Sequence, residues 1–294
     1  MRPYSGLRIA NSIFQAFHLI IAVDTAIELS ASIVLYRSDL SKFESTIRHL
    51  RIAATRARIS LEVIIIDQSG LASYSERVSY LCNQLGNKFF KLSHHITSKN
   101  LGYGGGHNVA LEMGVGRYHL ILNPDVEVHK NALTAALACF AQHPSVALIA
   151  PIALDAQGNE SYIAKRYPTV LTLFARAFLP KGMHWLVKDQ LQRYEIRDLP
   201  RDPPLQEIPL ASGCCMFLRG SVLAAVCGFD ERYFMYFEDF DLTLRVASQG
   251  STVRHSRVII NHYGGNAATK GFMHRYWFIR SAWLFFSKWG WRLF

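Results

Sequence analysis

The sequence predicts an α/β fold in which helices flank a mostly parallel, doubly wound sheet. Strand-like apolar runs alternate with helix-like periodic segments over the first 150 residues, and the connections between them are short. Two predicted strands also end at a carboxylate, at Asp67 and at Asp125. Open α/β sheets bind ligands beyond the carboxyl ends of their strands, so the same pattern places a candidate site there.

The first half of the chain supplies most of the predicted elements. Ala31–Tyr36 and Leu61–Ile66 are short apolar or β-branched runs, as expected of buried strands. In Leu40–Ala57, apolar residues recur at spacings of three and four, as on the buried face of a helix. Further strands are predicted at 89–92, 119–122 and 146–150, and further helices at 75–85, 109–114 and 131–142. A glycine-rich loop, 100–108, is expected to lead into helix 109–114.

The second half is less regular up to a predicted strand at 208–219 and a helical turn at 221–227. A helix that ends at Gly250 follows an aromatic stretch, and Glu238 and Asp239 lie at its start. Acidic residues at a helix start usually cap it, and capping is one interpretation of Glu238, Asp239 and Asp241. The rings before them favour another, in which a partly desolvated carboxylate acts as a general base.

Both ends of the chain lie outside the predicted domain. Residues 1–30 form an N-terminal extension whose apolar stretch, Ile13–Val23, is too short to span a bilayer. The C-terminal segment, 272–294, combines aromatic residues with Arg275, Arg280 and Lys288. Such a helix suits a membrane interface, and it equally suits a closing helix packed on the domain.

Composition narrows the class of protein. The chain has 294 residues, of which 50% are hydrophobic and 18% charged, which excludes a disordered protein. The formal net charge of +10 suits an anionic partner such as a phosphorylated substrate or an acidic membrane face. The cysteines lack metal-ligand spacing, so we expect core residues in a reducing, cytoplasmic compartment; they are Cys82, Cys139, Cys214, Cys215 and Cys227.

Two other ligand classes are disfavoured. The glycine run lacks the third glycine of a dinucleotide fingerprint, because His107 stands at that position, and no phosphate-loop lysine follows it. Basic residues are not gathered in one helix or sheet motif, so nucleic acid is not the expected partner. Asn123-Pro124-Asp125 ends the strand at Leu122 and is compatible with an ordinary turn as well as with a ligand site.

Four motifs in a fixed order resemble the family-2 glycosyltransferases, and within them the rhamnosyltransferase-like branch. They are N-L-G-Y-G-G-G-H-N (100–108), L-I-L-N-P-D-V-E-V (120–128), A-S-G-C-C-M-F-L (211–218) and G-F-D-E-R-Y-F-M-Y-F-E-D-F-D-L-T-L-R (228–245). The similarity extends from about Ala31 to the C-terminal helix. The resemblance implies a GT-A fold at 31–271, with a C-terminal acceptor-side portion and a closing helix at 272–294.

The resemblance also implies roles for individual residues. Asp125 and His262 would bind Mg²⁺ or Mn²⁺, and Asp239 would be the catalytic base of an inverting transfer. Nucleotide-sugar-binding positions would be Tyr36, Asp67, Asn100, Asn108, Asn123 and Asp125, and acceptor-side positions Glu238 and Tyr236.

The expected donor is dTDP-rhamnose or a UDP-sugar, and the expected acceptor is a lipid-linked or surface glycan such as O-antigen. Arg37 and Gln68 depart from the residues usual beside the nucleotide base, and Asn123 replaces the first acid of the family's D-x-D motif. These changes bear on which nucleotide is bound. The alternative function is a non-catalytic, membrane-associated scaffold subunit of a polysaccharide assembly system, against which the intact Asp125 and Asp239 argue.

Overall fold

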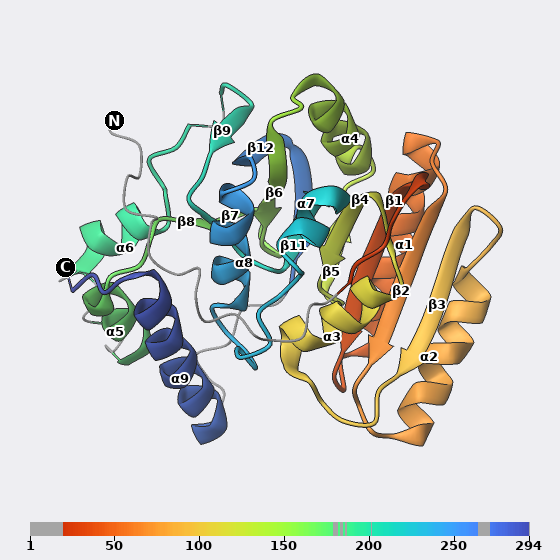
Figure 1. Cartoon of the computed structure of the whole chain (residues 1–294), viewed down its shortest axis with the longest axis horizontal. Helices are drawn as coiled ribbons and strands as arrows, with labels where there is room; N and C mark the ends of the chain where they lie inside the picture. Colours follow the sequence, from red (N-terminus) through yellow and green to blue (C-terminus); the bar gives the residue numbers. More distant parts are fainter. Residues whose placement is uncertain are drawn as a thin grey trace.

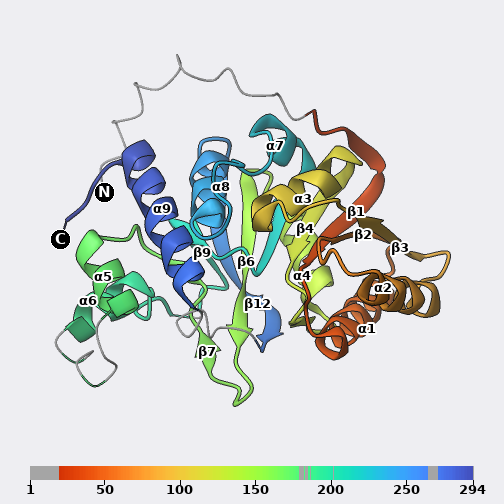
Figure 2. The same ribbon diagram turned by 90° about the horizontal axis from the view of Figure 1, so that it is seen from below.

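The computed structural model describes residues 20–178, 182, 185, 187–200, 202–263 and 271–293. Within them, three layers are arranged as helices, sheet and helices (Figure 1; Figure 2). Most of the expected N-terminal extension, residues 1–19, lies outside the described part of the chain. The α/β architecture predicted from the alternating pattern is therefore confirmed.

The middle layer is a mixed sheet, ten-stranded in the described residues. Its main path has the order β3-β2-β1-β4-β11-β6-β12-β5, and β7 and β9 pair outside this path. Four neighbouring strands are parallel: β3 (Phe90–Ile96), β2 (Leu61–Asp67), β1 (Val23–Leu35) and β4 (Val115–Leu122). β11 (Cys215–Arg219) is antiparallel to both β4 and β6 (Val146–Leu154). β12 (Ser251–His262) is parallel to β6, and β5 (Val126–Val128) is antiparallel to β12.

Short strands complete the edges. β7 (Glu160–Ser161) pairs with β6, and β9 (Leu205–Glu207) pairs with β12. β10 (Leu210–Ala211) and β8 (Ala164–Lys165) form a separate antiparallel pair. The expected strand at 208–219 is thus divided into β10 and β11 by the residues 212–214.

Helices cover both faces of the sheet. One face is covered by α1 (Leu40–Ala57), α2 (Ala72–Leu85) and α4 (Ala132–Gln142), the other by α3 (Gly102–Glu112), α7 (Gly220–Ala225) and α8 (Glu238–Ala247) (Figure 2). Apolar side chains at helical spacing pack between the first group of helices and the sheet, and Phe43, Ile47 and Leu50 of α1 are completely buried there. The core on the other face of the sheet contains Leu223, Leu242 and other apolar residues.

Strand β1 begins eight residues before the expected domain boundary. Residues 23–30 were assigned to the extension, but Val23 and Asp24 already pair with Val115 and Gly116 of β4. A register shift follows between Asp24 and Leu29, and the first half of the strand is largely exposed. Its polar, exposed residues obscured the strand pattern, which becomes visible only from Leu29 onward.

The glycine-rich segment is a helix and not the expected loop. α3 begins at Gly102, and its glycines let it approach its neighbours closely. A Cβ at Gly104 would lie 2.9 Å from Cβ of Phe229, and one at Gly106 would lie 2.7 Å from Cγ1 of Val34. The glycine run therefore serves close packing of α3 against the sheet and against the segment that precedes α8.

The cysteines are free thiols, and four of the five are buried as expected. Cys227 is the exception, because it lies in the turn after α7 with a φ of 56° and is exposed.

The C-terminal helix packs on the domain beside α8. α9 (Phe272–Trp289) buries Ser281, Phe285 and Phe286, and the two rings share a cluster with Tyr233 and Phe237. α5 (Val170–Phe178) and α6 (Lys188–Tyr194) lie near its C-terminal end (Figure 1). Full burial of a Phe side chain contributes roughly 1.5–3 kcal/mol, so the closing-helix interpretation holds for one face of α9. Of the helices described, none has the length and apolarity needed to span a bilayer.

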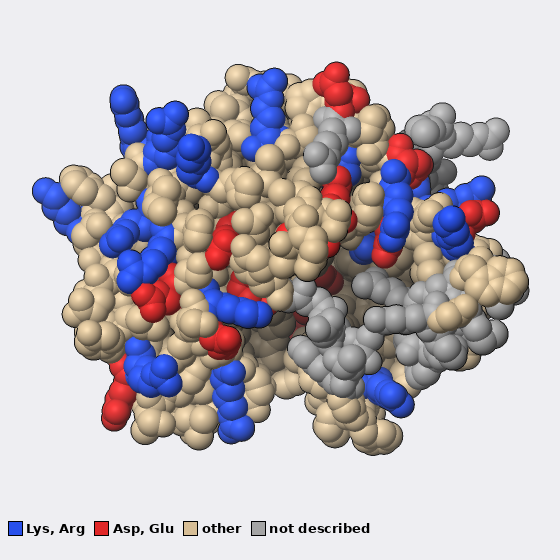
Figure 3. Space-filling model, turned by 180° about the vertical axis from the view of Figure 1, so that it is seen from behind, with Lys and Arg blue, Asp and Glu red and all other residues tan. Residues whose placement is uncertain are grey.

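Charge is dispersed over the face drawn in Figure 3. Lys and Arg side chains form several separate groups there, with Asp and Glu side chains between them. No single basic stripe crosses the described part of this face.

The packing of α3 can be tested with a pair of glycines that share a left-handed backbone. Gly102 has a φ of +80°, and an added Cβ would collide with the carbonyl oxygen of Phe234. Gly158 has a φ of +79° and nothing within 4 Å. We expect Gly158→Ala to lower the free energy of unfolding by about 1 kcal/mol, from backbone strain alone. Gly102→Ala should lower it by about 2–5 kcal/mol, because overpacking is added. Urea unfolding measures both, and equal losses would contradict the packing role.

Candidate active site

The carboxyl ends of three adjacent strands bring the predicted donor residues together. Leu35 of β1 pairs with Asp67 of β2, and Ile33 of β1 pairs with Leu122 of β4. The carboxyl ends of these neighbouring strands therefore carry Tyr36, Asp67 and Asn123. The sequence predicted this edge as the site, and the strand register gives it its geometry.

Asp67 is completely buried, and its carboxylate is held in place. One oxygen accepts a hydrogen bond from the Ser69 N–H at 2.8 Å, and the other accepts from the Ser75 hydroxyl at 2.5 Å. Nε2 of His94 lies 3.5 Å from the second oxygen. Each carboxylate oxygen has two lone pairs, so this fixed group can still accept from a ligand at the strand end.

The Tyr36 ring is half exposed beside Asp67 and can stack on a ligand from that side. Arg37 lies 5.6 Å from the centre of the ring and adopts a left-handed backbone with a φ of 53°.

Asn123, Asp125 and His262 form the centre of the site. β5 pairs with β12 so that His262 lies opposite Val126, and Nε2 of His262 is 3.7 Å from Oδ1 of Asp125. Oδ1 of Asp125 and Oδ1 of Asn123 are buried without a hydrogen-bond partner. Each of these buried oxygens could be satisfied by a bound cation or a polar ligand, and that of Asp125 lies near the His262 imidazole.

These residues fit a divalent ion that is shared with a ligand. No group of three or more His, Cys, Asp or Glu side chains in the described residues is arranged to hold a metal by itself. Mg²⁺ commonly takes one or two protein ligands and completes its shell with water and phosphate oxygens. Burial lowers the pKa of His262, although the charge of Asp125 opposes this, and the neutral imidazole is the form that binds metals.

Glu127 links α1 to the residue that follows His262, and the sequence did not identify it. Its carboxylate accepts from the Ser45 hydroxyl at 2.5 Å and from the Tyr263 hydroxyl at 2.9 Å. It thereby ties α1 to the end of β12, one residue beyond His262. The available signal was its place two residues after Asp125.

Asp239, the expected base, is the second residue of helix α8. Its Oδ2 accepts from the Gly213 N–H at 2.9 Å, and its Oδ1 accepts from the Phe240 N–H at 2.9 Å. Burial raises the pKa of Asp239 to about 6, in spite of these hydrogen bonds. A side chain at Gly213 would crowd this place, because a Cβ would lie 3.1 Å from the ring of Tyr103 and 3.2 Å from Cβ of Asp239.

Glu238 and Tyr236 lie beside the base. Burial, followed by the nearby Asp239 carboxylate, raises the pKa of Glu238 well above its usual range. Tyr236 and Phe237 have φ values of 69° and 66°, an uncommon backbone for residues that carry side chains. The Tyr236 hydroxyl hydrogen-bonds Nδ1 of His274 on α9 at 3.0 Å, so this acceptor-side candidate is also part of the helix contact.

The carboxylates of Asp125 and Asp239 both influence the pKa of one buried thiol, that of Cys214. Burial raises the pKa of Cys214 to about 12, and the charges of Asp125 and Asp239 both add to the increase, against a hydrogen bond with Ser212. The Asn123 N–H donates to the Cys214 carbonyl at 2.9 Å. The structure thus brings the two acids, which are far apart in the sequence, to the same end of β11.

The two remaining donor candidates hold structural bonds. Asn100 accepts from the Gly102 N–H at 2.9 Å at the start of α3. The side-chain amide of Asn108 is buried and bonds the backbone N–H and C=O of Phe229 at 2.8 and 2.9 Å. Asn108 therefore anchors the turn before α8, and its contact with a donor stays a prediction.

The fold matches solved glycosyltransferase structures. A Staphylococcus aureus TarS structure (residues 1–349) superposes with a TM-score of 0.54 at 17% identity, covering 81% of this chain and 60% of that one. The mannosyltransferase PcManGT from Pyrobaculum calidifontis, in complex with GDP-Man and Mn²⁺, gives a TM-score of 0.56 at 15% identity, covering 89% and 63%. The chain therefore has the GT-A fold, as expected.

Sequence similarity points to the same class. An N-acetylglucosaminyl-diphospho-decaprenol L-rhamnosyltransferase of Mycobacterium tuberculosis is 30% identical over 165 residues, covering 52% of each chain. Rhamnosyltransferase WbbL of Escherichia coli is 24% identical over 164 residues, covering 53% of this chain and 58% of that one. The chain thus spans about half the length of the curated relatives it matches. No family model matches the sequence.

The raised pKa of Asp239 gives a direct test of the site. We expect the carboxyl carbon of Asp239, observed by NMR with ¹³C-labelled aspartate, to titrate with a midpoint of about 6, against about 3.9 for an ordinary Asp. The carboxylate is then a proton acceptor above this pH and is blocked below it. Asp239→Asn assigns the resonance by removing it. A midpoint at the ordinary value would show that burial does not tune this group.

Proposed function

We propose that the chain is an inverting, metal-dependent glycosyltransferase that moves a sugar from a nucleoside diphosphate to an acceptor hydroxyl. The observation that carries the proposal is the pair of acids at the end of β11. Asp125 presents an unpartnered oxygen, and Asp239 is a buried carboxylate with a pKa of about 6. In a single displacement, Asp125 would serve the departing diphosphate and Asp239 would serve the attacking hydroxyl.

The donor would lie along the strand ends. Its base would stack on Tyr36 and hydrogen-bond Asp67, and its diphosphate would reach Asp125 and Asn123. Asp125 and His262 would hold Mg²⁺ or Mn²⁺, and the ion would stabilise the negative charge that develops on the departing diphosphate. The β5–β12 pairing, which sets His262 opposite Val126, supports this role, as does the Glu127 link from α1 to Tyr263.

Asp239 would accept the proton of the acceptor hydroxyl. The N–H groups of Gly213 and Phe240 orient the carboxylate, and its pKa of about 6 makes it a stronger base than an exposed Asp while it stays ionised at neutral pH. Glu238 and Tyr236 would border the acceptor. A single base is sufficient for direct displacement, so the sugar would invert at its anomeric carbon.

The names of the relatives support a choice of substrates. Two relatives described above are rhamnosyltransferases, and one is named for a lipid-linked diphosphate acceptor. We propose rhamnose, from its dTDP derivative, as the transferred sugar, with a UDP-sugar as the alternative donor. A lipid-linked or surface glycan of the cell envelope is the proposed acceptor, reached from the cytoplasmic side of the membrane.

Substitution of the two acids should separate donor binding from transfer. A thermal-shift panel of sugar nucleotides with Mn²⁺ identifies the donor, since a ligand that binds only the folded state raises the melting temperature. We expect Asp239→Asn to keep this shift and to lose transfer by on the order of 10²–10⁴-fold. Asp125→Ala should lose the metal-dependent part of the shift.

A scaffold protein would behave differently in the same assays. It would show no metal-dependent hydrolysis of any donor, so hydrolysis by the wild-type protein separates the enzyme from the scaffold. Wild-type turnover in Asp239→Asn would show that another group is the base.

The outer face of α9 is the proposed membrane contact. Phe272, Tyr276, Ile279 and Trp283 follow one another at spacings of three and four and are 49–82% exposed. This stripe lies opposite the buried Phe285, and the exposed Arg275 and Arg280 are close to it in sequence. The helix contains no acidic residue. An apolar stripe with basic neighbours suits the interface of an anionic bilayer.

Two isoleucines of similar exposure test this contact. Ile279 on α9 is 56% exposed, and Ile52 on α1, on the other side of the sheet, is 53% exposed. We expect Ile279→Ser to weaken co-flotation with phosphatidylglycerol vesicles several-fold, because buried apolar area drives interfacial binding. Ile52→Ser serves as the matched control and should leave flotation unchanged. Equal behaviour of the two variants would show that α9 does not contact the bilayer.

A further inference from the structure

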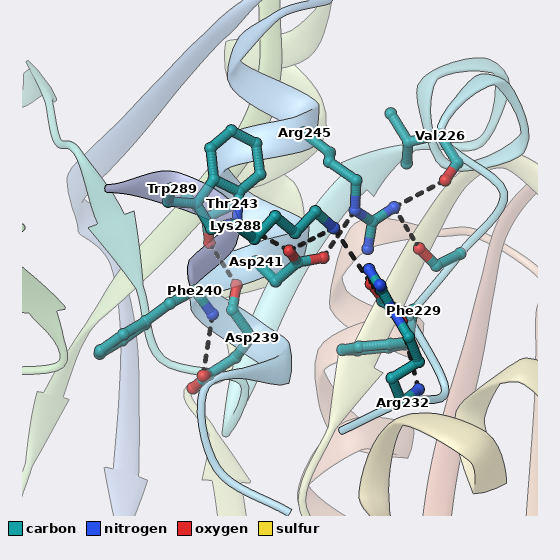
Figure 4. A network of polar contacts seen from close by, with 12 residues as sticks. Val226, Phe229, Arg232, Asp239, Phe240, Asp241, Thr243, Arg245, Lys288 and Trp289 are labelled. Atoms are coloured by element: carbon teal, nitrogen blue, oxygen red, sulfur yellow. Dashed lines mark hydrogen bonds and ion pairs between the residues drawn. The ribbon is translucent and has the colours of Figure 1, made fainter. Parts of the chain in front are cut away.

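A network of buried charges joins the helix of Asp239 to the C-terminal helix (Figure 4). At its centre is Asp241, two residues beyond Asp239 and completely buried. Its Oδ2 accepts from Nε of Arg245 at 2.7 Å. Its Oδ1 accepts from Nε1 of Trp289 at 2.8 Å and lies 2.6 Å from Nζ of Lys288. α9 therefore holds α8 through a carboxylate as well as through apolar contacts.

The same charges fix the turn that leads into α8. Nη1 of Arg245 donates to the carbonyls of Val226 and Gly228 at 2.6 and 2.7 Å. Nζ of Lys288 donates to Asp230 at 3.0 Å. Burial opposes ionisation of Asp230, but the hydrogen bond from Arg232 and the charge of Lys288 lower its pKa well below the usual range. The network thus contains two acids, Asp230 and Asp241, and Lys288 of α9 contacts both of them.

The first turn of α8 depends on this network because it lacks a side-chain cap. The helix begins after Phe237, whose side chain makes no capping bond. The turn is closed by the Asp241 N–H, which donates to the Phe237 carbonyl at 2.9 Å. The residue that closes the turn carrying Asp239 is therefore the residue that α9 holds.

We infer that Asp241, Lys288 and Trp289 are positioning residues for Asp239, and that the C-terminal helix is a working part of the transfer site. The inference rests on the proposed function, since it takes Asp239 as the base. None of the three touches the groups placed at the donor. They act by fixing the backbone from which the Asp239 carboxylate projects, and a small displacement of a reacting group strongly lowers the rate.

A double-mutant cycle on turnover tests the inference, with the donor that the thermal-shift panel identifies. Trp289→Phe removes one N–H, Lys288→Met removes the amine, and Asp241→Asn removes the charge they bind. We expect each to lower kcat by about tenfold or more with an unchanged KM for the donor, because Asp67 and Asp125 are untouched. In the Asp241→Asn background, Trp289→Phe should have little further effect, since its partner is already altered.

A control variant separates positioning from general attachment of α9. The Tyr167 hydroxyl donates to the Gly290 carbonyl at 2.8 Å, directly after the end of the same helix, in a bond that does not involve Asp241. Tyr167→Phe removes one hydrogen bond, as Trp289→Phe does, and should leave kcat unchanged.

Hydrogen exchange gives a readout that does not require turnover. The amides of residues 239–243 should exchange about tenfold faster in Trp289→Phe and Lys288→Met than in the wild type or in Tyr167→Phe. Additive losses in the cycle, an unchanged kcat, or exchange no faster than in Tyr167→Phe would each overturn the inference. Failure of the wild-type protein to use any donor would instead contradict the proposed function, and exchange would still decide whether the network holds this turn.

Discussion

The antiparallel pairing of β11 with β4 is the constraint on which the site depends. It sets Cys215 opposite Leu122, so the residues just before β11 meet the residues just after β4. Asn123 and Asp125 follow β4, and Gly213, which precedes β11, holds the carboxylate of Asp239. A slip of one residue in this register would turn the inward side chains of β11 outward and move Gly213 away from α8. Asp125 and Asp239 lie at the same end of β11 because this strand is antiparallel to both of its neighbours.

Glycines in α3 allow this helix to pack against the segment that precedes α8. α3 can approach the segment before α8 only because Gly102 and Gly104 carry no side chain. Asn108, one turn further along the same helix, then bonds the backbone of Phe229. The segment that delivers Asp239 is consequently fixed from two sides, by α3 through backbone contact and by α9 through charge.

Local patterns predicted the elements that obey a simple period. Helix α1 was placed at its observed bounds because its apolar residues recur regularly, and β2 was placed within one residue because it is a continuous apolar run. The start of β1 and the helical state of the glycine run were wrong in the sequence analysis, because exposure and tertiary packing decide them. The sequence proposed Asp125 and Asp239 through their motifs, whereas Glu127 and His94 act through contacts that only the folded chain creates.

The F-E-D-F-D segment shows how one helix start treats neighbouring acids in opposite ways. Asp241 accepts from Arg245 and Trp289 and lies beside Lys288, so its charge is balanced where it is buried. Asp239, two residues earlier and so on another face of the helix, accepts only neutral N–H groups in the described structure, and burial raises its pKa to about 6. A cation beside Asp239 would stabilise the carboxylate and weaken it as a base. Because Asp239 and Asp241 lie on different faces of the helix, the cations contact Asp241, which anchors the helix. Asp239 is left able to accept a proton.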